Sequence, residues 1–205
     1  MSESLGGESS ASRKEIVLFH SAYGLKPGVL QWAERLRSVG HTVHTPDLYD
    51  GEVFSFSNRM DAVRKIQEVG FDGVLARSQA AVSHLPNDLV YAGYSNGAAC
   101  AELLAAIRPG ARGAILMHGP LPIRDLGWEG WPATVPVQVH FAEKDPRRDQ
   151  KVIERLAERV RSSGTAFEVH DYPGSGHLFA EPDMPDYDAN AAEAMFQSVV
   201  KFLNF

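Results

Sequence analysis

The chain alternates short apolar runs of strand length with longer runs in which apolar residues recur at helical spacing. We expect strands over residues 15–20, 42–45, 88–92, 113–117, 135–141 and 166–171, and helices over 29–39, 58–69, 71–85, 95–108, 151–162 and 188–203. Nearly continuous apolar strands are typical of a sheet covered on both faces. The pattern predicts an α/β fold with a mostly parallel, doubly wound sheet and helices on both faces.

Length and composition predict one folded unit preceded by a tail. A chain of 205 residues with 44% hydrophobic content is long enough for one domain, which we expect over residues 13–205. Residues 1–12 are rich in Ser, Gly and Glu and lack the apolar stretch of a secretory signal, so we expect a disordered N-terminal tail. Nowhere does an apolar run reach the length of a membrane span, and we expect no membrane partner.

Charge and cysteine content exclude several classes of partner. The formal charge of −6 comes from residues of both signs scattered through the sequence, which disfavours nucleic-acid binding. Cys100 is the sole cysteine, so neither an internal disulfide nor a cysteine-based zinc site is possible, and a cytoplasmic protein is expected. His41 and His44 have the spacing of metal ligands only on a helix, and they stand on an expected strand. We therefore predict no metal site.

Five residues between an expected strand and helix, Gly93 to Gly97, read Gly-Tyr-Ser-Asn-Gly. The pattern G-x-S-x-G is typical of a sharp strand-to-helix turn that raises its serine above the sheet edge, with glycines where no side chain fits. The motif is short enough to occur by chance, and the flanking strand and helix give it weight. Ser95 is thus a candidate nucleophile.

An acid and a base follow later strands in the order that such a serine requires. A serine hydroxyl needs a histidine base, and the histidine needs a carboxylate that orients it. Asp145 comes just after the strand at 135–141, and His177 follows the strand at 166–171 in a glycine-rich loop. These positions predict a Ser95–His177–Asp145 triad at the carboxyl edge of the sheet.

Two backbone N–H groups are expected to form an oxyanion hole. One belongs to Asn96, directly after the nucleophile at a helix start, and the other to Ala22, in the loop after the first strand. Chemistry of this kind needs neither a metal nor an organic cofactor. His20, His118 and His140 also lie at or near strand ends. His20 and His118 are candidates for a place near the site, and for all three a structural, hydrogen-bonded role is the commoner alternative.

Several segments together resemble the dienelactone hydrolase family of α/β-hydrolases over residues 15–205. They are His20 to Leu25, Pro46-Asp47-Leu48-Tyr49, the Gly93 to Gly97 turn, Glu143-Lys144-Asp145 and Gly176-His177-Leu178-Phe179. The resemblance implies an α/β-hydrolase fold and hydrolysis of a small ester or lactone.

Three positions depart from that family's founding enzymes. Their nucleophile is a cysteine, and here it is Ser95, as in members with general esterase character. The resemblance implies a glutamate in the loop after the first strand, where this chain has Ser21. It also implies a substrate-binding arginine a few residues beyond the histidine, where this chain has Glu181. A glutamate there is expected to repel an anionic lactone.

The substrate pocket is expected to involve Ser21, Tyr23, Tyr49, Trp128 and Phe179, which border the motif loops. For Trp128, anchoring of its own loop is an equal alternative. The connection from residue 117 to residue 135 is too short for a cap domain. We therefore expect an open site suited to small soluble esters or lactones.

The leading hypothesis is a serine hydrolase that cleaves a small carboxylic ester or lactone through an acyl-enzyme. One alternative is a non-catalytic ligand-binding module on a hydrolase scaffold. Another is an acyl or peroxy transferase that uses the same acyl-enzyme with a different acceptor. The expected assembly is a monomer or a weak homo-oligomer.

Overall fold

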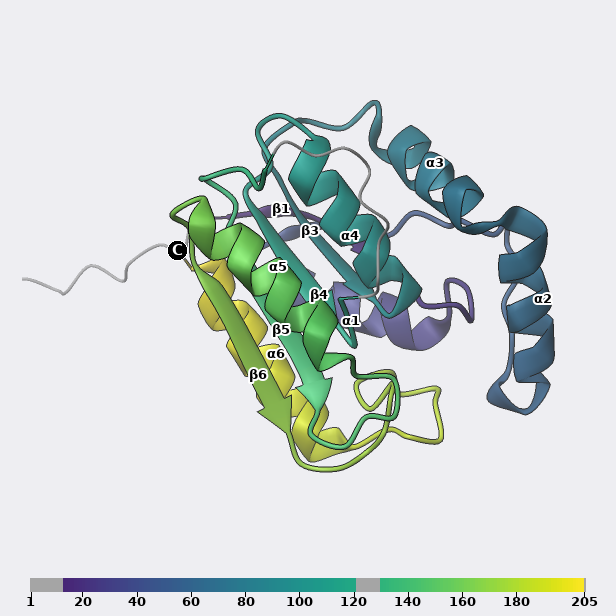
Figure 1. The fold of residues 1–205 in the computed structure, drawn as a ribbon. Coiled ribbons are helices and arrows are strands. Elements are labelled where there is room, and N and C mark those ends of the chain that lie inside the picture. The colour runs from purple at the N-terminus through teal and green to yellow at the C-terminus, as the bar shows by residue number, and fades with distance from the viewer. Residues whose placement is uncertain (1–12, 121–129, 205) are drawn as a thin grey trace, which may run out of the picture.

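The computed structural model describes residues 13–120 and 130–204. Its centre is a six-stranded sheet in the order β2-β1-β3-β4-β5-β6, in which every neighbouring pair is parallel (Figure 1). The strands are β1 (Glu15–Phe19), β2 (Thr42–His44), β3 (Leu89–Tyr94), β4 (Gly113–Met117), β5 (Val137–Ala142) and β6 (Phe167–Tyr172).

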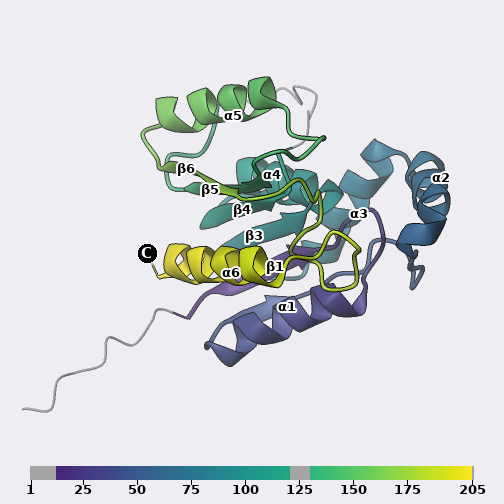
Figure 2. The same ribbon diagram turned by 90° about the horizontal axis from the view of Figure 1, so that it is seen from below.

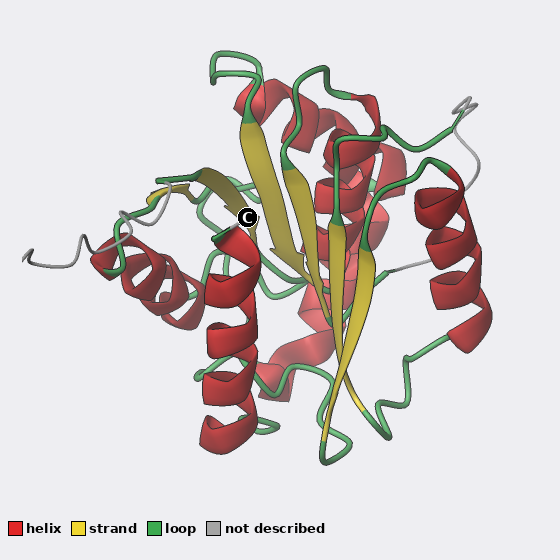
Figure 3. Ribbon diagram, turned by 90° about the vertical axis from the view of Figure 1, so that its left-hand side faces the viewer, coloured by secondary structure: helices red, strands yellow, loops and turns green. Residues whose placement is uncertain are grey.

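Helices cover both faces of this sheet. The described helices are α1 (Pro27–Ser38), α2 (Arg59–Val69), α3 (Phe71–Val82), α4 (Asn96–Ile107), α5 (Gln150–Ser162) and α6 (Ala189–Leu203), with a short 3-10 helix, η1 (Phe56–Asn58), before α2. Helices α4 and α5 lie on one face and α1 and α6 on the other (Figure 2), and the strands run between the two helical layers (Figure 3). The predicted doubly wound α/β architecture is confirmed.

Burial along the strands explains their sequences. All six residues of the central strand β3 are buried, because helices cover both its faces, and its run is continuously apolar. Edge strand β6 instead mixes buried and exposed residues. One apolar cluster packs beneath α4 and α5 and includes Leu104 and Phe141. A second packs beneath α1 and α6, where the Trp32 and Phe196 rings meet edge to face at 5.3 Å.

Element boundaries follow local chemistry. The expected break between the helices at 58–69 and 71–85 falls at Gly70, whose φ of 72° glycine tolerates well. Strand β3 runs two residues further than expected, since Gly93 and Tyr94 pair with β4. The side chains of Asp149 and Asp188 accept backbone hydrogen bonds in the first turns of α5 and α6 and so cap these helices.

Two predictions fall outside the described residues, namely the tail over 1–12 and the role of Trp128. Over residues 13–120 and 130–204, no helix combines the length and apolar character needed to cross a membrane.

Candidate active site

Ser95 lies at the turn between β3 and α4, at the carboxyl end of the central strand. Its backbone is in the left-handed region, with φ 51° and ψ −109°, a conformation that a non-glycine residue adopts only when its surroundings enforce it. The enforcing contacts are a hydrogen bond from the Ser95 N–H to the Met117 carbonyl, at 2.8 Å, and the start of α4 immediately after it. The serine is held in a strained, fixed position and is 2% exposed.

The two glycines of the motif are required by close backbone approach. A Cβ atom on Gly93 would collide with the carbonyl of Gly97. One on Gly97 would come within 2.5 Å of the Phe19 oxygen and 2.6 Å of the His20 oxygen, both fixed parts of the backbone. The motif therefore packs helix α4 directly against the end of β1, and this contact brings the loop after β1 beside Ser95.

His177 lies between Ser95 and Asp145. Its Nε2 is 2.9 Å from the Ser95 Oγ, and its Nδ1 is 2.8 Å from Oδ2 of Asp145. Because an ionised carboxylate only accepts, Nδ1 carries the proton and Nε2 is left to accept the serine hydrogen. The three side chains thus form one hydrogen-bonded chain in which the base points its lone pair at the serine.

The loops that carry the acid and the base are tied together. The Asp145 carboxylate also accepts the Arg147 N–H at 2.8 Å through Oδ1, which fixes the rotation of its side chain. The Lys144 N–H donates to the Gly174 carbonyl at 3.0 Å, joining the loop after β5 to the loop after β6. On the other side, the His177 N–H donates to Asp186 at 3.2 Å. These bonds preorganise the histidine before any ligand binds.

The predicted oxyanion donors lie in the two loops that border Ser95. Asn96 is the first residue of α4, so its N–H has no partner within the helix and points out of the positive end of the helix dipole. Ala22 lies in the turn that follows β1, where the N–H of Gly24 donates to the carbonyl of Ser21 at 3.2 Å. Their role as donors to a substrate oxygen remains a prediction.

Ser21 and Glu181, two positions that depart from the family pattern, lie next to each other. Burial raises the pKa of Glu181 to about 7, and the neighbouring Ser21 hydroxyl and Lys26 ammonium moderate the rise. The expected repulsion of an anionic lactone needs a carboxylate that faces the substrate. Glu181 is instead 0% exposed, a burial that its position in the sequence does not reveal.

The aromatic pocket candidates among the described residues, Tyr23, Tyr49 and Phe179, pack against other rings. Tyr49 packs edge to face against His20 with ring centroids 4.9 Å apart, and Phe179 packs the same way against His118 at 4.8 Å. Tyr23, Tyr49 and Phe179 are all buried. Any contact between these rings and a substrate therefore remains a prediction.

His118 lies closer to the site than its sequence position alone required. It directly follows β4, adopts a φ of 58°, and its ring centroid is 5.8 Å from that of His177. Neither ring nitrogen has a hydrogen-bond partner in the described structure, and burial holds the pKa of His118 well below its usual value. A neutral ring beside His177 adds no positive charge to the base. In the sequence, the position of His118 directly after a strand was the signal that it lies near the active site.

A parallel sheet with a serine at the β3–α4 turn, and an acid and a histidine after later strands, defines the protein as an α/β-hydrolase. The dienelactone hydrolase family model matches residues 3–205, and the chain belongs to that family. A lactone is a cyclic carboxylic ester, so by class the protein is a carboxylic ester hydrolase acting on a small molecule.

Similar proteins share the architecture at low sequence identity. A Yersinia pestis protein named "Putative carboxymethylenebutenolidase" is 22% identical over 201 residues, which cover 90% of this chain and 75% of that protein. A dienelactone hydrolase-like promiscuous phosphotriesterase from metagenomic libraries superposes with a TM-score of 0.75 at 19% identity, covering 93% of this chain and 85% of that one. A Bacillus cereus carboxylesterase gives a TM-score of 0.56 at 18% identity, with coverages of 94% and 90%.

Proposed function

We propose that the protein hydrolyses small carboxylic esters or lactones with Ser95 as nucleophile and an acyl-enzyme as intermediate. The observation that carries this proposal is the hydrogen-bonded chain from the Ser95 Oγ through His177 to Asp145, with distances of 2.9 and 2.8 Å. Both distances lie within hydrogen-bond reach, which is what a general base and the carboxylate that orients it require.

In the first half-reaction, the Ser95 Oγ forms a bond to the substrate carbonyl carbon while its proton moves to Nε2 of His177. The carbonyl π electrons move to oxygen, and the N–H groups of Asn96 and Ala22 hold that oxyanion. When the tetrahedral intermediate collapses, the ester C–O bond breaks and Nε2 gives its proton to the departing alkoxide. Asp145 keeps Nδ1 protonated and stabilises the imidazolium.

In the second half-reaction, water attacks the acyl carbon and His177 takes the water proton. The Ser95 Oγ then leaves as the carboxylic acid forms, and it recovers a proton from Nε2. The sum is one ester and one water converted to one acid and one alcohol. Neither half-reaction consumes an oxidant or a reductant.

The arrangement of the triad supports catalysis over the alternative of a non-catalytic binding module. A binding module has no need for a strained serine aligned with a base that has a single available lone pair. An acyl transferase would use the same first half-reaction, with an alcohol or peroxide replacing water in the second.

The test is hydrolysis of p-nitrophenyl acetate by Ser95→Ala. Removal of the nucleophile is expected to lower kcat by at least about 10³-fold with the fold intact. Ser175→Ala is the matched control, because Ser175 is exposed and lies two residues before His177. A fluorophosphonate probe is expected to label wild type and Ser175→Ala but not Ser95→Ala, with the mass shift on the peptide that contains Ser95. Unchanged turnover in Ser95→Ala would overturn the proposal.

Adding methanol or hydrogen peroxide to the wild-type reaction separates hydrolysis from transfer. Free acid as the main product supports hydrolysis, whereas methyl ester or peracid in excess of acid identifies a transferase.

A further inference from the structure

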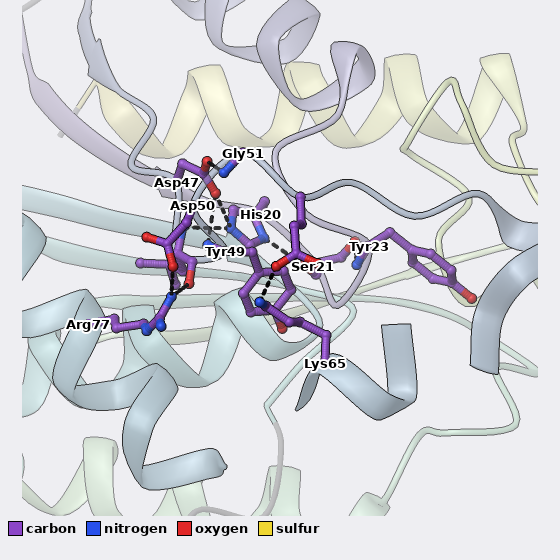
Figure 4. Close-up of polar contacts among 11 residues, drawn as sticks. His20, Ser21, Tyr23, Asp47, Tyr49, Asp50, Gly51, Lys65 and Arg77 are labelled. Carbon is purple, nitrogen blue, oxygen red and sulfur yellow. Dashed lines mark hydrogen bonds and ion pairs between the residues drawn. The ribbon is translucent and has the colours of Figure 1, made fainter. Parts of the chain in front are cut away.

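The buried ring of His20 joins two loops next to the active site, and the mechanism above assigns it no role. His20 directly follows β1 and is 2% exposed. Its Nδ1 is 2.7 Å from the carbonyl oxygen of Ser21 (Figure 4). Its Nε2 is 3.0 Å from the backbone nitrogen of Leu48. A carbonyl only accepts and a backbone N–H only donates, so Nδ1 carries a proton and Nε2 does not.

The surroundings keep this ring neutral. Burial lowers the pKa of His20, against smaller opposing effects of the Ser21 carbonyl and the Asp47 carboxylate. Asp47 Oδ1 is 3.8 Å from Nε2, but this carboxylate already accepts the N–H groups of Tyr49 and Gly51. A proton on Nε2 would also face the Leu48 N–H. The ring therefore serves as a fixed donor and acceptor between the two loops.

The bond to Ser21 sets the direction of the next N–H group. The Ser21 carbonyl accepts from both His20 and the Gly24 N–H, which fixes the plane of the peptide that joins Ser21 to Ala22. In the described residues the one cis peptide is that before Pro120, so the bond before Ala22 is trans and its N–H points opposite to the fixed carbonyl. Within the same residues this N–H has no protein acceptor, and it is left available to a ligand.

The loop so held lies against the nucleophile turn. Gly97 packs on the carbonyls of Phe19 and His20, as described above. The ring of Tyr49 rests on His20, and burial raises the pKa of its hydroxyl to about 12, a rise that the nearby Asn96 side chain moderates. His20 thus contacts the elements that carry both expected oxyanion donors.

We propose that His20 is a positioning residue for the oxyanion hole, which holds the Ala22 N–H toward the substrate oxygen. The inference rests on the proposed function. It gives His177 and His20, both at the carboxyl edge of the sheet, different roles: His177 exchanges a proton with substrate, whereas His20 keeps its proton and acts through the backbone of the next two residues.

A donor that acts on the oxyanion stabilises the transition state more than the bound ester. Loss of His20 is therefore expected to lower kcat with little change in KM. Removing a complete oxyanion donor costs about 10²- to 10³-fold in kcat. Loss of alignment alone should cost less, about 10- to 100-fold.

The experiment compares His20→Phe with His20→Gln. Phenylalanine fills the space without either hydrogen bond, whereas the glutamine amide has one group that can donate to Ser21 and one that can accept from Leu48. We expect kcat for p-nitrophenyl acetate to fall about 10- to 100-fold in His20→Phe and to stay within about 5-fold of wild type in His20→Gln. If His20→Phe does not fold, His20→Ala removes the same bonds without adding bulk.

The matched control is His41→Phe. His41 is likewise buried and accepts a backbone N–H, from Lys14 at 3.3 Å. It directly precedes β2, however, and so lies at the amino ends of the strands, away from the site at their carboxyl ends. This variant is expected to lose stability without a selective loss of kcat.

A second readout separates alignment of the oxyanion hole from general loosening of the fold. In the thiono analogue of the ester, a weakly accepting sulfur replaces the carbonyl oxygen and gains little from the N–H donors. We expect His20→Phe to slow the oxygen ester much more than the thiono ester, so that their rate ratio shrinks. Equal slowing of both substrates, or a wild-type kcat in His20→Phe, overturns the positioning role.

Failure of this inference is distinguishable from failure of the proposed function. If Ser95→Ala is inactive while His20→Phe retains full kcat, only the role of His20 is wrong. If Ser95→Ala retains activity, the proposed mechanism itself is wrong.

Discussion

The Nδ1 of His177 lies 2.8 Å from Oδ2 of Asp145, whose side chain is fully shielded from solvent. Thirty-two positions separate the two residues in sequence, and their contact depends on the pairing of β5 with β6. A buried carboxylate paired in this way fixes both the tautomer and the orientation of the imidazole.

Asp145→Asn is expected to lower kcat by about 10³- to 10⁴-fold while preserving the shape of the site, because the amide N–H₂ group favours the wrong imidazole tautomer. The measurement is steady-state hydrolysis of p-nitrophenyl acetate. Asp149→Asn serves as control, since Asp149 caps α5 in the same loop and affects only that helix. Equal kcat in Asp145→Asn and wild type would contradict the assignment of the acid.

Gly97→Ala is expected to disrupt packing between α4 and the end of β1. The added methyl group would collide with the carbonyls of Phe19 and His20, which are backbone atoms and cannot rotate away. Chemical denaturation should show a loss of about 2 kcal/mol or more. Gly73→Ala is the control: a Cβ at this position in α3 would approach only a methyl group of Val69, the last residue of α2, and the substitution should change stability by less than about 1 kcal/mol.

Glu181→Gln is expected to flatten the pH dependence of stability. Burial raises the pKa of Glu181 to about 7 in the folded protein, so the folded state binds the proton more tightly than the unfolded state. The stability that the folded protein gains from the protonated Glu181 carboxyl is fully present below pH 4.5, and it is lost as the pH rises to about 7. The loss amounts to at most about 3 kcal/mol, at roughly 1.4 kcal/mol per pH unit.

At pH 8, Glu181→Gln should therefore be more stable than wild type, whereas at pH 4.5 the two should be similar. Urea unfolding at both values measures the difference. Burial also raises the pKa of Glu102, to about 8, so part of the dependence should persist in the variant. A variant less stable than wild type at pH 8 would show that the carboxylate is stabilised by its surroundings. Glu158→Gln, at an exposed position, is the control and should change the free energy of unfolding by no more than about 0.5 kcal/mol at either pH.

Arg108→Lys is expected to lower stability without affecting kcat. The guanidinium of Arg108 donates to the carbonyls of Val82, Leu85 and Pro86, and an ammonium group cannot reproduce that fork. The cost should be about 1–3 kcal/mol in urea unfolding. Because α4 is 12 residues long, this site lies about 18 Å from Ser95. A selective fall in kcat would show that the far end of α4 is coupled to the nucleophile. Exposed Arg155→Lys is the control.

Much of the fold was predictable because its signals are local. The runs at 88–92 and 113–117 are apolar enough to indicate strands that are buried on both faces, and Gly70 alone marks the boundary between two helices. The order of Ser95, Asp145 and His177 along the chain was also visible, since each follows a recognisable strand.

The relations between distant segments were not predictable in this way. Ser21 and Glu181 appeared as two separate departures from a family pattern, and only the folded chain places them side by side and buries the carboxyl completely. Likewise, nothing around His20 in the sequence indicates that its ring bonds the Leu48 N–H, 28 positions away.

The sequence by itself therefore determined the class of fold, the strand ends that carry chemistry and the residue types placed there, because hydrophobic period and motif spacing act over a few neighbouring residues. The tertiary structure decided which of those groups meet, which way their protons point and whether a charge is exposed or buried. These properties depend on the order of strands in the sheet and on desolvation by segments far away in sequence, which local patterns do not encode.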